Sequence, residues 1–273
     1  MSESRFDRTA DRYVEAAQKK DWTAFIELCR PQPDDRALDV AAGPALLSAQ
    51  LVPLVARAVA LEPSRPLLEH APEGVEPVLG EAEQMPFQDS SFELVTIVNS
   101  LHHVADMRAA LAEMVRVVTQ GGRIVVQDYL ADRDPERAEV WERVERLRDP
   151  DHRRLPRPGE VPGLLAEHGF GEDEAQTWTA SWSLDDWLEM AEPPYAAAAE
   201  IRRLVAADRF ELTAWRARFT ARRGQVNGPP AANICGWLSP PVCTARACAR
   251  ITRFRSSRSP TCWSSRTRWC GSM

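Results

Sequence analysis

Hydrophobic and polar positions alternate in blocks along the chain, and from residue 36 onward the blocks predict strands and helices in turn. Short apolar runs of strand length are ALDVA at 37–41, AVALE at 58–62, VEPVL at 75–79, FELVTIVNS at 92–100 and RIVVQDY at 123–129. Between the last two runs, five apolar side chains at helical spacing over 106–118 share one face. This alternation predicts an α/β fold, a Rossmann-like doubly wound, mostly parallel sheet with helices on both faces.

The flanking segments are less regular. Residues 5–29 read as one or two helices, and we expect further helices within 134–150 and 158–170. Residues 175–191 begin with period-two character and then turn helical, whereas 195–223 look helical throughout. We therefore expect a helical segment at 1–30, a main domain at 31–224 and a separate tail at 225–273, and the closing strand pair of the sheet is expected to be incomplete.

The tail has an unusual composition. It holds no acidic residue, seven arginines and five of the six cysteines, and it shows no hydrophobic period. A GC-rich gene read in a shifted frame would yield such a segment, and we hypothesise that the native last strand was lost in this way. A genuine disordered basic tail is the alternative. The cysteine spacings match no zinc pattern, so no metal site is predicted.

Composition limits the class of protein. With 273 residues and 44% hydrophobic content the chain can bury a sizeable core, and it has no run of eighteen apolar residues that would predict a membrane-spanning helix. The first 22 residues are polar and charged, which favours a cytoplasmic location. Residues 1–224 carry a net charge of −13, which argues against nucleic acid as a partner.

The first strand–turn–helix unit, DVAAGPALLS, is a candidate cradle for a cofactor. Asp39 ends the strand and the helix follows from about Pro44, so backbone N–H groups and the positive helix end point at the turn. Gly43 supplies one position without a Cβ atom, and Ala41 and Ala45 stand where further glycines would ease a close approach.

Two carboxylate-bearing segments extend this candidate site. Glu62 ends the second strand, where an acid can accept hydrogen bonds from both ribose hydroxyls and would repel a ribose phosphate. The loop after the third strand carries Glu81 and Glu83, which could accept from an adenine amino group while the Ala82 backbone edges the ring. An ordinary acidic loop, packed by its Met and Phe side chains, is the alternative for this segment.

Together the segments LDVAAGPALLS, ALEPSRPLLEHA, GEAEQMPFQDSSFELV and VNSLHHVADMRAALAEMVRVVTQGGRIVVQD resemble the class I S-adenosylmethionine-dependent methyltransferases. The resemblance is greatest to the branch with the ubiquinone and menaquinone biosynthesis C-methyltransferases. It implies S-adenosylmethionine as cofactor and an N-terminal helical lid that carries Tyr13. The cofactor-binding residues that it implies are Asp39, Ala41, Gly43, Pro44, Glu62, Pro63, Glu81, Ala82, Glu83, Asn99 and Leu101.

Methyl transfer from a sulfonium is an in-line displacement that mainly needs alignment of the reactants. An oxygen or acidic carbon nucleophile also needs a base, and His102 and His103 are the candidates because they follow the tip of the fourth strand. Capping or packing is the alternative role for both. Tyr13 is a candidate donor to the substrate, and we expect His70, His152 and His168 at the surface.

The acceptor pocket is expected from the segment after the fifth strand, 131–224. Apolar and aromatic side chains there suit a small apolar or aromatic acceptor, although core packing explains them equally well. They are Trp141, Val144, Leu147, Trp178, Trp182 and Trp187. The arginines at 143, 146, 148, 153 and 154 could meet an anionic substrate or form a solvated face.

Two other functions stay open at this point. An NAD-dependent oxidoreductase could share such a turn, but the GxGxxG spacing is absent and no hydride-transfer apparatus follows. A protein that binds the cofactor without methylating anything is the second alternative. The sequence predicts neither the oligomeric state nor the atom that is methylated.

Overall fold

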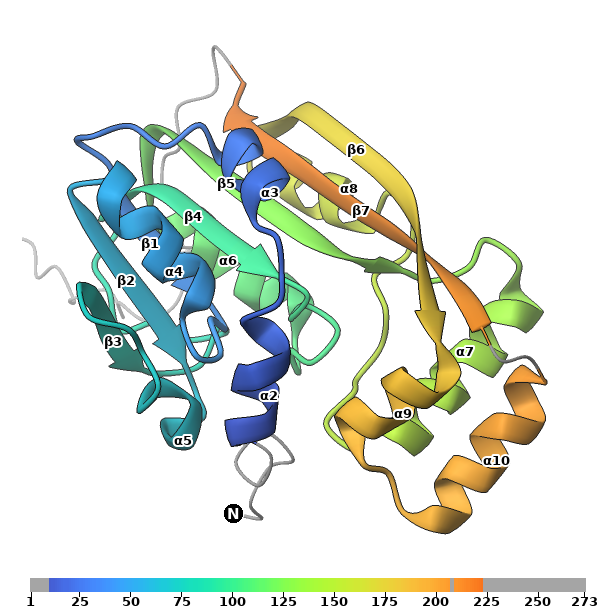
Figure 1. Ribbon diagram of the computed structural model, residues 1–273. Coiled ribbons are helices and arrows are strands. Elements are labelled where there is room, and N and C mark those ends of the chain that lie inside the picture. The colour runs from blue at the N-terminus through green and yellow to red at the C-terminus, as the bar shows by residue number, and fades with distance from the viewer. Residues whose placement is uncertain (1–9, 207–208, 223–273) are drawn as a thin grey trace, which may run out of the picture. The chain divides into compact units, whose positions relative to one another are not determined.

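The computed structural model describes residues 10–206 and 209–222, with the side chains at 12, 13, 16 and 17 not described. Its strands form one sheet in the order β3-β2-β1-β4-β5-β7-β6 (Figure 1). Their bounds are Arg36–Val40 for β1, Arg57–Glu62 for β2, Val75–Leu79 for β3, Phe92–Val98 for β4, Val118–Leu130 for β5, Phe170–Ser183 for β6 and Arg209–Ala221 for β7.

The first five strands are parallel, as the sequence predicts. β1 lies at the centre, with β2 on one side and β4 on the other, so the chain reverses its direction of travel across the sheet at β1. Because these five strands are parallel, their carboxyl ends all lie at the same edge of the sheet. Ligands of open α/β sheets bind at this edge, where the strand order reverses.

Helices cover both faces of the sheet (Figure 1). One face carries α3, Thr23–Cys29, and α4, Leu46–Leu51, with a short 3₁₀ turn at Val52–Leu54 and α5 at Arg65–Leu68. The other face carries α6, Met107–Val117, and α8, Glu160–Glu167. Each side buries its own apolar cluster: Phe25 packs with Leu94 and Val125 on the first face, and Met114 packs with Ile97 on the second.

The structure contradicts the prediction that residues 195–223 are helical throughout. The helix expected over 195–223 ends early, as α10 at Tyr195–Val205, and Arg209–Ala221 forms β7. Buried Phe210 and Leu212 alternate with exposed Arg209 and Glu211, which is the period of a strand. The segment that follows, WRARFTA, is rich in arginine and alanine, whose high helix propensity conceals that period.

The closing strand pair is therefore present, and the expectation that it is incomplete is wrong. β6 and β7 pair antiparallel from Phe170 opposite Ala221 to Ser183 opposite Arg209, and β7 also pairs antiparallel with β5. The buried Arg218 side chain secures it, because its guanidinium donates to the exposed Asp173 carboxylate at 2.6 Å and to the Leu28 carbonyl of α3 at 3.0 Å. The tail at 225–273 lies outside the described residues, and the frame-shift hypothesis concerns only that segment.

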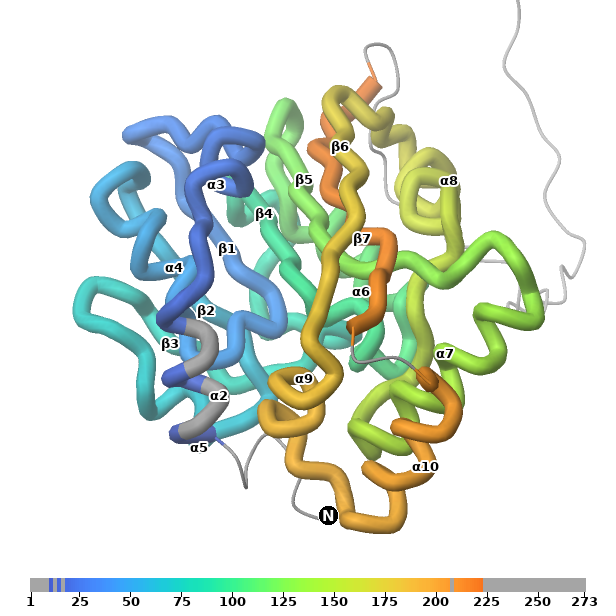
Figure 2. Tube along the Cα trace, turned by 45° about the vertical axis from the view of Figure 1, so that its right-hand side comes forward, coloured from blue at the N-terminus to red at the C-terminus, as the bar shows by residue number. Residues whose placement is uncertain are grey.

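β6 and β7 extend past the end of β5, and a group of helices packs around the extension (Figure 2). These are α7, Pro135–Arg148, α9, Leu184–Ala191, and α10. They enclose a third apolar cluster, built around Val144, Trp187, Ile201 and Phe210, which we call the cap core. The helix α2, Ala10–Ala17, lies against α5 and α9. Within the described residues no helix is both long and apolar enough to cross a membrane.

Candidate functional site

The turn after β1 adopts an unusual backbone conformation. Ala41, Gly43 and Ala45 all have left-handed φ angles, of 52°, 57° and 57°. A left-handed residue with a Cβ atom costs about 1–2 kcal/mol, and glycine avoids most of this cost. The alanines therefore occupy positions whose backbone suits glycine, and Gly43 is the one glycine among these three left-handed residues.

Glu62 fastens the end of β2 to this turn. Its Oε2 accepts a hydrogen bond from the Gly43 amide at 2.9 Å, and Oε1 accepts from the Ser64 amide at 3.0 Å. Burial raises the pKa of Glu62 to about 7, although these two amide hydrogen bonds pull it down. Each carboxylate oxygen retains acceptor capacity, which is what a cofactor diol would require.

Asp39 lies deeper in the same region. Its two oxygens accept from the Ser48 hydroxyl at 3.0 Å and the Thr96 hydroxyl at 2.9 Å, so it bridges α4 and β4 beneath the turn. Burial raises the pKa of Asp39 to about 6, opposed by the two hydroxyl hydrogen bonds. These bonds assign Asp39 a role in shaping the turn, and the sequence pattern alone contained no sign of them.

The loop after β3, which the sequence predicts to contact adenine, places its three predicted residues in different surroundings. Ala82 is buried in the core, and Glu81 is exposed at a short bridge with Gln84. Glu83 turns the other way, because its Oε1 accepts from the amides of Ala105 and Asp106 at 2.8 and 3.2 Å. Of the two acids, Glu81 is thus the one left facing solvent beside Ala82.

The loop after β4 is hydrogen-bonded to the left-handed turn after β1. Asn99 has a left-handed φ of 51°, and its amide donates to the Gln127 carbonyl of β5 at 2.7 Å. The Ser100 hydroxyl donates to the Ala41 carbonyl at 3.1 Å, and Leu101 is buried in the core. This loop therefore holds the two predicted histidines against the strand-end edge of the sheet.

His102 is clamped by a buried carboxylate. Its Nδ1 lies 2.6 Å from Oδ1 of Asp128, and its backbone amide donates to Oδ2 of the same residue at 3.3 Å. Asp128 is fully buried in β5 and also accepts from the Tyr129 amide at 2.7 Å. Burial alone would lower the pKa of His102, but the charge of Asp128, the hydrogen bond to it and the charge of Glu145 raise it overall.

Two further histidines adjoin this pair. The ring centroids of His103 and His152 lie 4.2 and 5.7 Å from that of His102. The expectation that His152 lies at the surface is wrong: its side chain is fully buried, and its Nε2 lies 3.0 Å from Oε2 of Glu142. Neither this packing nor the role of Asp128 could be read from the sequence, because both link segments far apart along the chain.

Tyr13 belongs to α2, but its side chain lies outside what the structure describes, so its predicted role as a donor stays a prediction. Pro44 and Pro63, also predicted to bind the cofactor, follow Gly43 and Glu62 directly, and Pro44 is buried whereas Pro63 is exposed. Over the described residues, no group of three or more His, Cys, Asp or Glu side chains is arranged to hold a metal ion.

The aromatic and basic residues that the sequence suggests for the acceptor pocket lie in several different environments in the structure. Val144 and Trp187 form the cap core, whereas Trp178 is 37% exposed with the Arg216 guanidinium 4.9 Å from its ring centre. Trp182 lies edge-on to Tyr129 with ring centroids 6.3 Å apart. Among the arginines, Arg143, Arg148 and Arg154 are paired with Glu200, Glu145 and Glu160.

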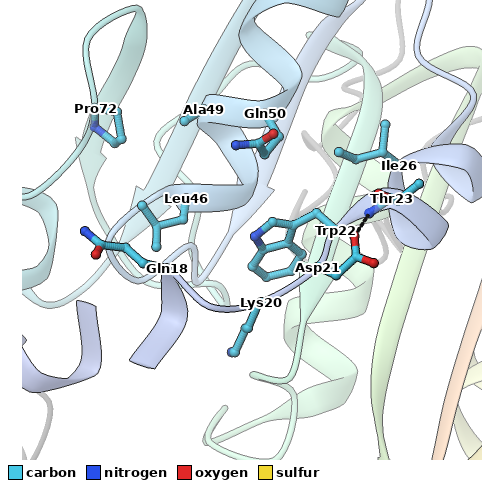
Figure 3. A pocket seen from close by; sticks show the side chains of 10 residues that line it. All are labelled: Gln18, Lys20, Asp21, Trp22, Thr23, Ile26, Leu46, Ala49, Gln50 and Pro72. Carbon is cyan, nitrogen blue, oxygen red and sulfur yellow. Dashed lines mark hydrogen bonds between the residues drawn. The ribbon is translucent and has the colours of Figure 1, made fainter. Parts of the chain in front are cut away.

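Two cavities lie near these elements without containing the predicted cofactor residues. One of about 380 Å³ is lined by the link between α2 and α3 and by Leu46, Ala49 and Gln50 of α4, on the outer side of that helix (Figure 3). The other, of about 500 Å³, lies between α6, α8 and the loop that carries His152. We therefore define the site by Glu62, Gly43 and the β4 loop.

Comparison with known proteins agrees with this architecture. Residues 38–126 match the family model for a methyltransferase domain. This part of the chain is similar to that domain. The matched segment runs from β1 to the middle of β5 and so contains the left-handed turn, Glu62 and the histidine loop. The resemblance to class I S-adenosylmethionine-dependent methyltransferases and the predicted fold class are confirmed.

The similarity to individual proteins extends beyond residues 38–126. This chain is 28% identical to the uncharacterized methyltransferase YcgJ of Bacillus subtilis over 71% of its own length and 81% of that relative. The crystal structure of YcgJ superposes with a TM-score of 0.70 at 25% identity, covering 74% of this chain and 98% of YcgJ. Demethylmenaquinone methyltransferase of Mycolicibacterium gilvum is 37% identical over 46% of this chain, and the match spans only 59% of that relative's length.

Proposed function

We propose that this protein transfers a methyl group from S-adenosylmethionine to a small, apolar or aromatic acceptor by in-line displacement. The observation that carries the proposal is the Glu62 carboxylate, buried at the end of β2 and hydrogen-bonded to the Gly43 amide of the left-handed turn. An acid there suits a ribose diol, and the turn and the helix end suit the amino-acid part of the cofactor.

The residues present fit such a cofactor. Glu62 would hold the ribose, Ala82 with Glu81 would flank the adenine, and Gly43 would admit the methionine moiety. Asn99 and Leu101 would border the sulfonium end, and Asp39 would support the turn from below. The cofactor supplies a methyl group already activated on sulfur, so this chain's residues have to align the acceptor and exclude water, which can contribute on the order of 7–11 kcal/mol at most.

The acceptor class, the lid role of residues 1–30 and a cytoplasmic location are parts of the same proposal. Support for the lid is the position of α2 against α5 and α9 at the strand-end edge. Support for a small molecule rather than a nucleic acid is the net charge of −13 over residues 1–224.

Calorimetry on the purified full chain tests the proposal. We expect heat with S-adenosylmethionine and S-adenosylhomocysteine and none with NAD. Mass spectrometry should then detect S-adenosylhomocysteine when small aromatic acceptors are added. Tight NAD binding without cofactor binding would make the protein an oxidoreductase, and cofactor binding without product across a broad acceptor panel would make it a non-methylating binder.

A further inference from the structure

A cavity of about 500 Å³ lies where the start of α6, the end of α7, the loop after α7 and the helix α8 meet. Sites for small molecules are hollows of about 300–1,000 Å³, so this cavity is large enough for one. None of the described residues that line it is among those predicted to bind the cofactor. Its charged lining residues are Asp106, Arg108, Arg146, Arg153, Arg154 and Glu160. Arginines therefore outnumber acids in the charged part of the lining.

This basic lining belongs to an acidic part of the chain, because residues 1–224 carry a net charge of −13. Arginines gathered in one hollow repel one another unless a carboxylate or a bound anion lies among them. Two of the four are offset by the chain itself. Arg154 donates to both carboxylate oxygens of Glu160, at 2.6 and 2.8 Å, and Arg108 is paired with Glu167. These two guanidinium groups are already occupied.

The other two arginines keep most of their donors for a ligand. Arg153 is exposed, and over residues 10–206 and 209–222 its guanidinium group forms no ion pair. Arg146 is also exposed and approaches Oε2 of Glu142 only at 3.5 Å. The Glu142 carboxylate already faces Nε2 of His152 at 3.0 Å and accepts from the Leu155 amide at 2.8 Å. Since a guanidinium group carries five N–H donors, Arg153 and Arg146 supply an uncompensated charge and several hydrogen bonds.

The start of α6 adds donors to the same cavity. The carboxylate of its N-cap residue, Asp106, accepts from the Ala109 amide at 3.1 Å. The amides of Met107 and Arg108, the first two of the helix, have no acceptor within the part of the chain that the structure describes. Amides of a first helical turn carry the positive end of the helix dipole and favour an oxyanion.

The backbone that carries Arg153 is held in place without a ligand. The Arg153 amide donates to the His102 carbonyl at 2.8 Å, and the neighbouring His152 ring lies against Glu142 of α7. Binding therefore does not have to order this loop first, which lowers its cost. The uncharged part of the lining is largely apolar and consists of Val104, Ala105, Met107 and Leu164 besides His152. A ligand with an apolar body and one anionic group matches both parts.

We propose that this cavity binds an oxyanion, the carboxylate or phosphate group of a small ligand with an apolar body, through Arg153, Arg146 and the amides that begin α6. The planar fork of arginine matches both groups. The ligand is either the methyl acceptor itself, with its acidic group held here, or a separate small anion. The first case rests on the proposed function, because the loop after β4 connects the cavity at Val104 to Ser100, which is bonded to Ala41. The second case is independent of it.

Calorimetry on the purified full chain is the first test, with benzoate and inorganic phosphate as probes and benzamide as the uncharged counterpart of benzoate. An ionic strength of about 0.01 M keeps screening weak, and sodium chloride at the same ionic strength is the reference. We expect heat with at least one of the two anions and none with benzamide. No heat with either anion would overturn the inference.

Two substitutions test which residues bind the anion. A hydrogen bond to a charged group is strong enough that Arg153→Gln should raise the Kd roughly 10- to 150-fold. Arg146→Gln should raise it less, because Glu142 engages part of that side chain. Arg203→Gln, at an exposed position of α10 outside the cavity, removes the same charge and should leave the Kd unchanged. Equal affinity of Arg153→Gln and the unmodified protein, with thermal unfolding showing both folded, would overturn the assignment.

Kinetics with paired acceptors distinguish the two sources of the anion. Each aromatic acceptor is tested as its carboxylic acid and as the matching amide, with S-adenosylhomocysteine measured as product. If the acceptor supplies the anion, the acid should have the lower KM, phosphate should compete with it, and Arg153→Gln should raise the KM of the acid alone. If the anion is separate, benzoate or phosphate should still bind when the acceptor is saturating.

The failure of this inference differs from the failure of the proposed function. Anion binding that depends on Arg153, in a protein that binds no S-adenosylmethionine, would remove the proposed function and leave the cavity site intact. Binding of S-adenosylmethionine with no binding of benzoate or phosphate would remove the cavity site alone.

Discussion

The backbone amide of Gly43 donates a 2.9 Å hydrogen bond to Oε2 of Glu62, so one buried carboxylate joins the turn after β1 to the end of β2. The second oxygen of the same group accepts from the Ser64 amide, which belongs to the N-cap residue of α5. Glu62 thus joins the turn after β1, the end of β2 and the start of α5. A ligand that binds its carboxylate would be linked to all three through hydrogen bonds.

Replacing Glu62 with Gln should weaken cofactor binding. A hydrogen bond to a charged group contributes about 1.5–3 kcal/mol, so we expect the Kd for S-adenosylhomocysteine to rise roughly 10- to 150-fold. Glu69→Gln, at an exposed position just after α5, is the control and should leave the Kd unchanged. The measurement is isothermal calorimetry, and equal affinity of Glu62→Gln and the unmodified protein would contradict the role of Glu62.

Cofactor binding should release a proton near neutral pH. Burial raises the pKa of Glu62 to about 7, and the ribose hydroxyls would donate to its ionised form, so binding favours ionisation. Affinity should therefore fall as the pH drops from about 8 to 6. Calorimetry in buffers of different ionisation enthalpy measures the released proton directly, and the release should be absent in Glu62→Gln.

The stability of the cofactor-free protein should fall as the pH rises. The folded pKa of Glu62, about 7, lies above its ordinary 4.5, so the folded state binds this proton more tightly than the unfolded chain does. The contribution is complete below about pH 4.5 and is lost as the pH rises through 7, by roughly 3 kcal/mol. Asp39, with a pKa raised from 3.8 to about 6, acts in the same direction at lower pH.

Urea unfolding from about pH 5 to 8 measures this dependence, with the difference between the unmodified protein and Glu62→Gln isolating the Glu62 contribution. The variant should retain only the part of the decline that Asp39 and the other titrating groups produce. Parallel pH profiles for the two proteins would show that Glu62 ionises in the folded state as easily as in water.

Replacing a left-handed alanine of the turn after β1 with glycine should not lower the free energy of unfolding. Ala45→Gly removes the strain of a φ of 57°, which outweighs the extra entropy of glycine in the unfolded chain, so stability should hold or rise by up to about 1 kcal/mol. Ala49→Gly, inside α4, should cost about 1 kcal/mol. Urea unfolding distinguishes them, and a loss at Ala45 as large as that at Ala49 would contradict the strained conformation.

Two tryptophans of the C-terminal region should differ in how much they contribute to the free energy of unfolding. Trp187 is 3% exposed in the cap core, and Trp187→Ala should cost about 3–5 kcal/mol. Trp178 is 37% exposed beside Arg216, and Trp178→Ala should cost at most about 1 kcal/mol. Thermal unfolding measures both, and similar losses would mean that the two residues share one environment.

The sequence predicted more of the edge where the parallel strands end than of the C-terminal region. Apolar runs and the acids that end them identified β1, β2 and Glu62, because strand length and strand-end position are local properties. β7 was missed since the composition of its second half favours a helix, and only pairing with β5 and β6 makes that segment a strand. Trp187 could be marked as apolar but not assigned to a core, because its partners come from three separate segments.

The amino-acid sequence by itself determined the order of strands and helices through β5, the turn after β1 as a candidate cradle, and the acid at the end of β2. Local spacing and residue chemistry are sufficient for these features. Only the tertiary structure decided that His102 faces Asp128, that Asp39 is used beneath the turn, that His152 is buried and that β7 closes the sheet. Each of these depends on a neighbour far away in the chain, and such neighbours are set by how the layers pack rather than by any nearby residue.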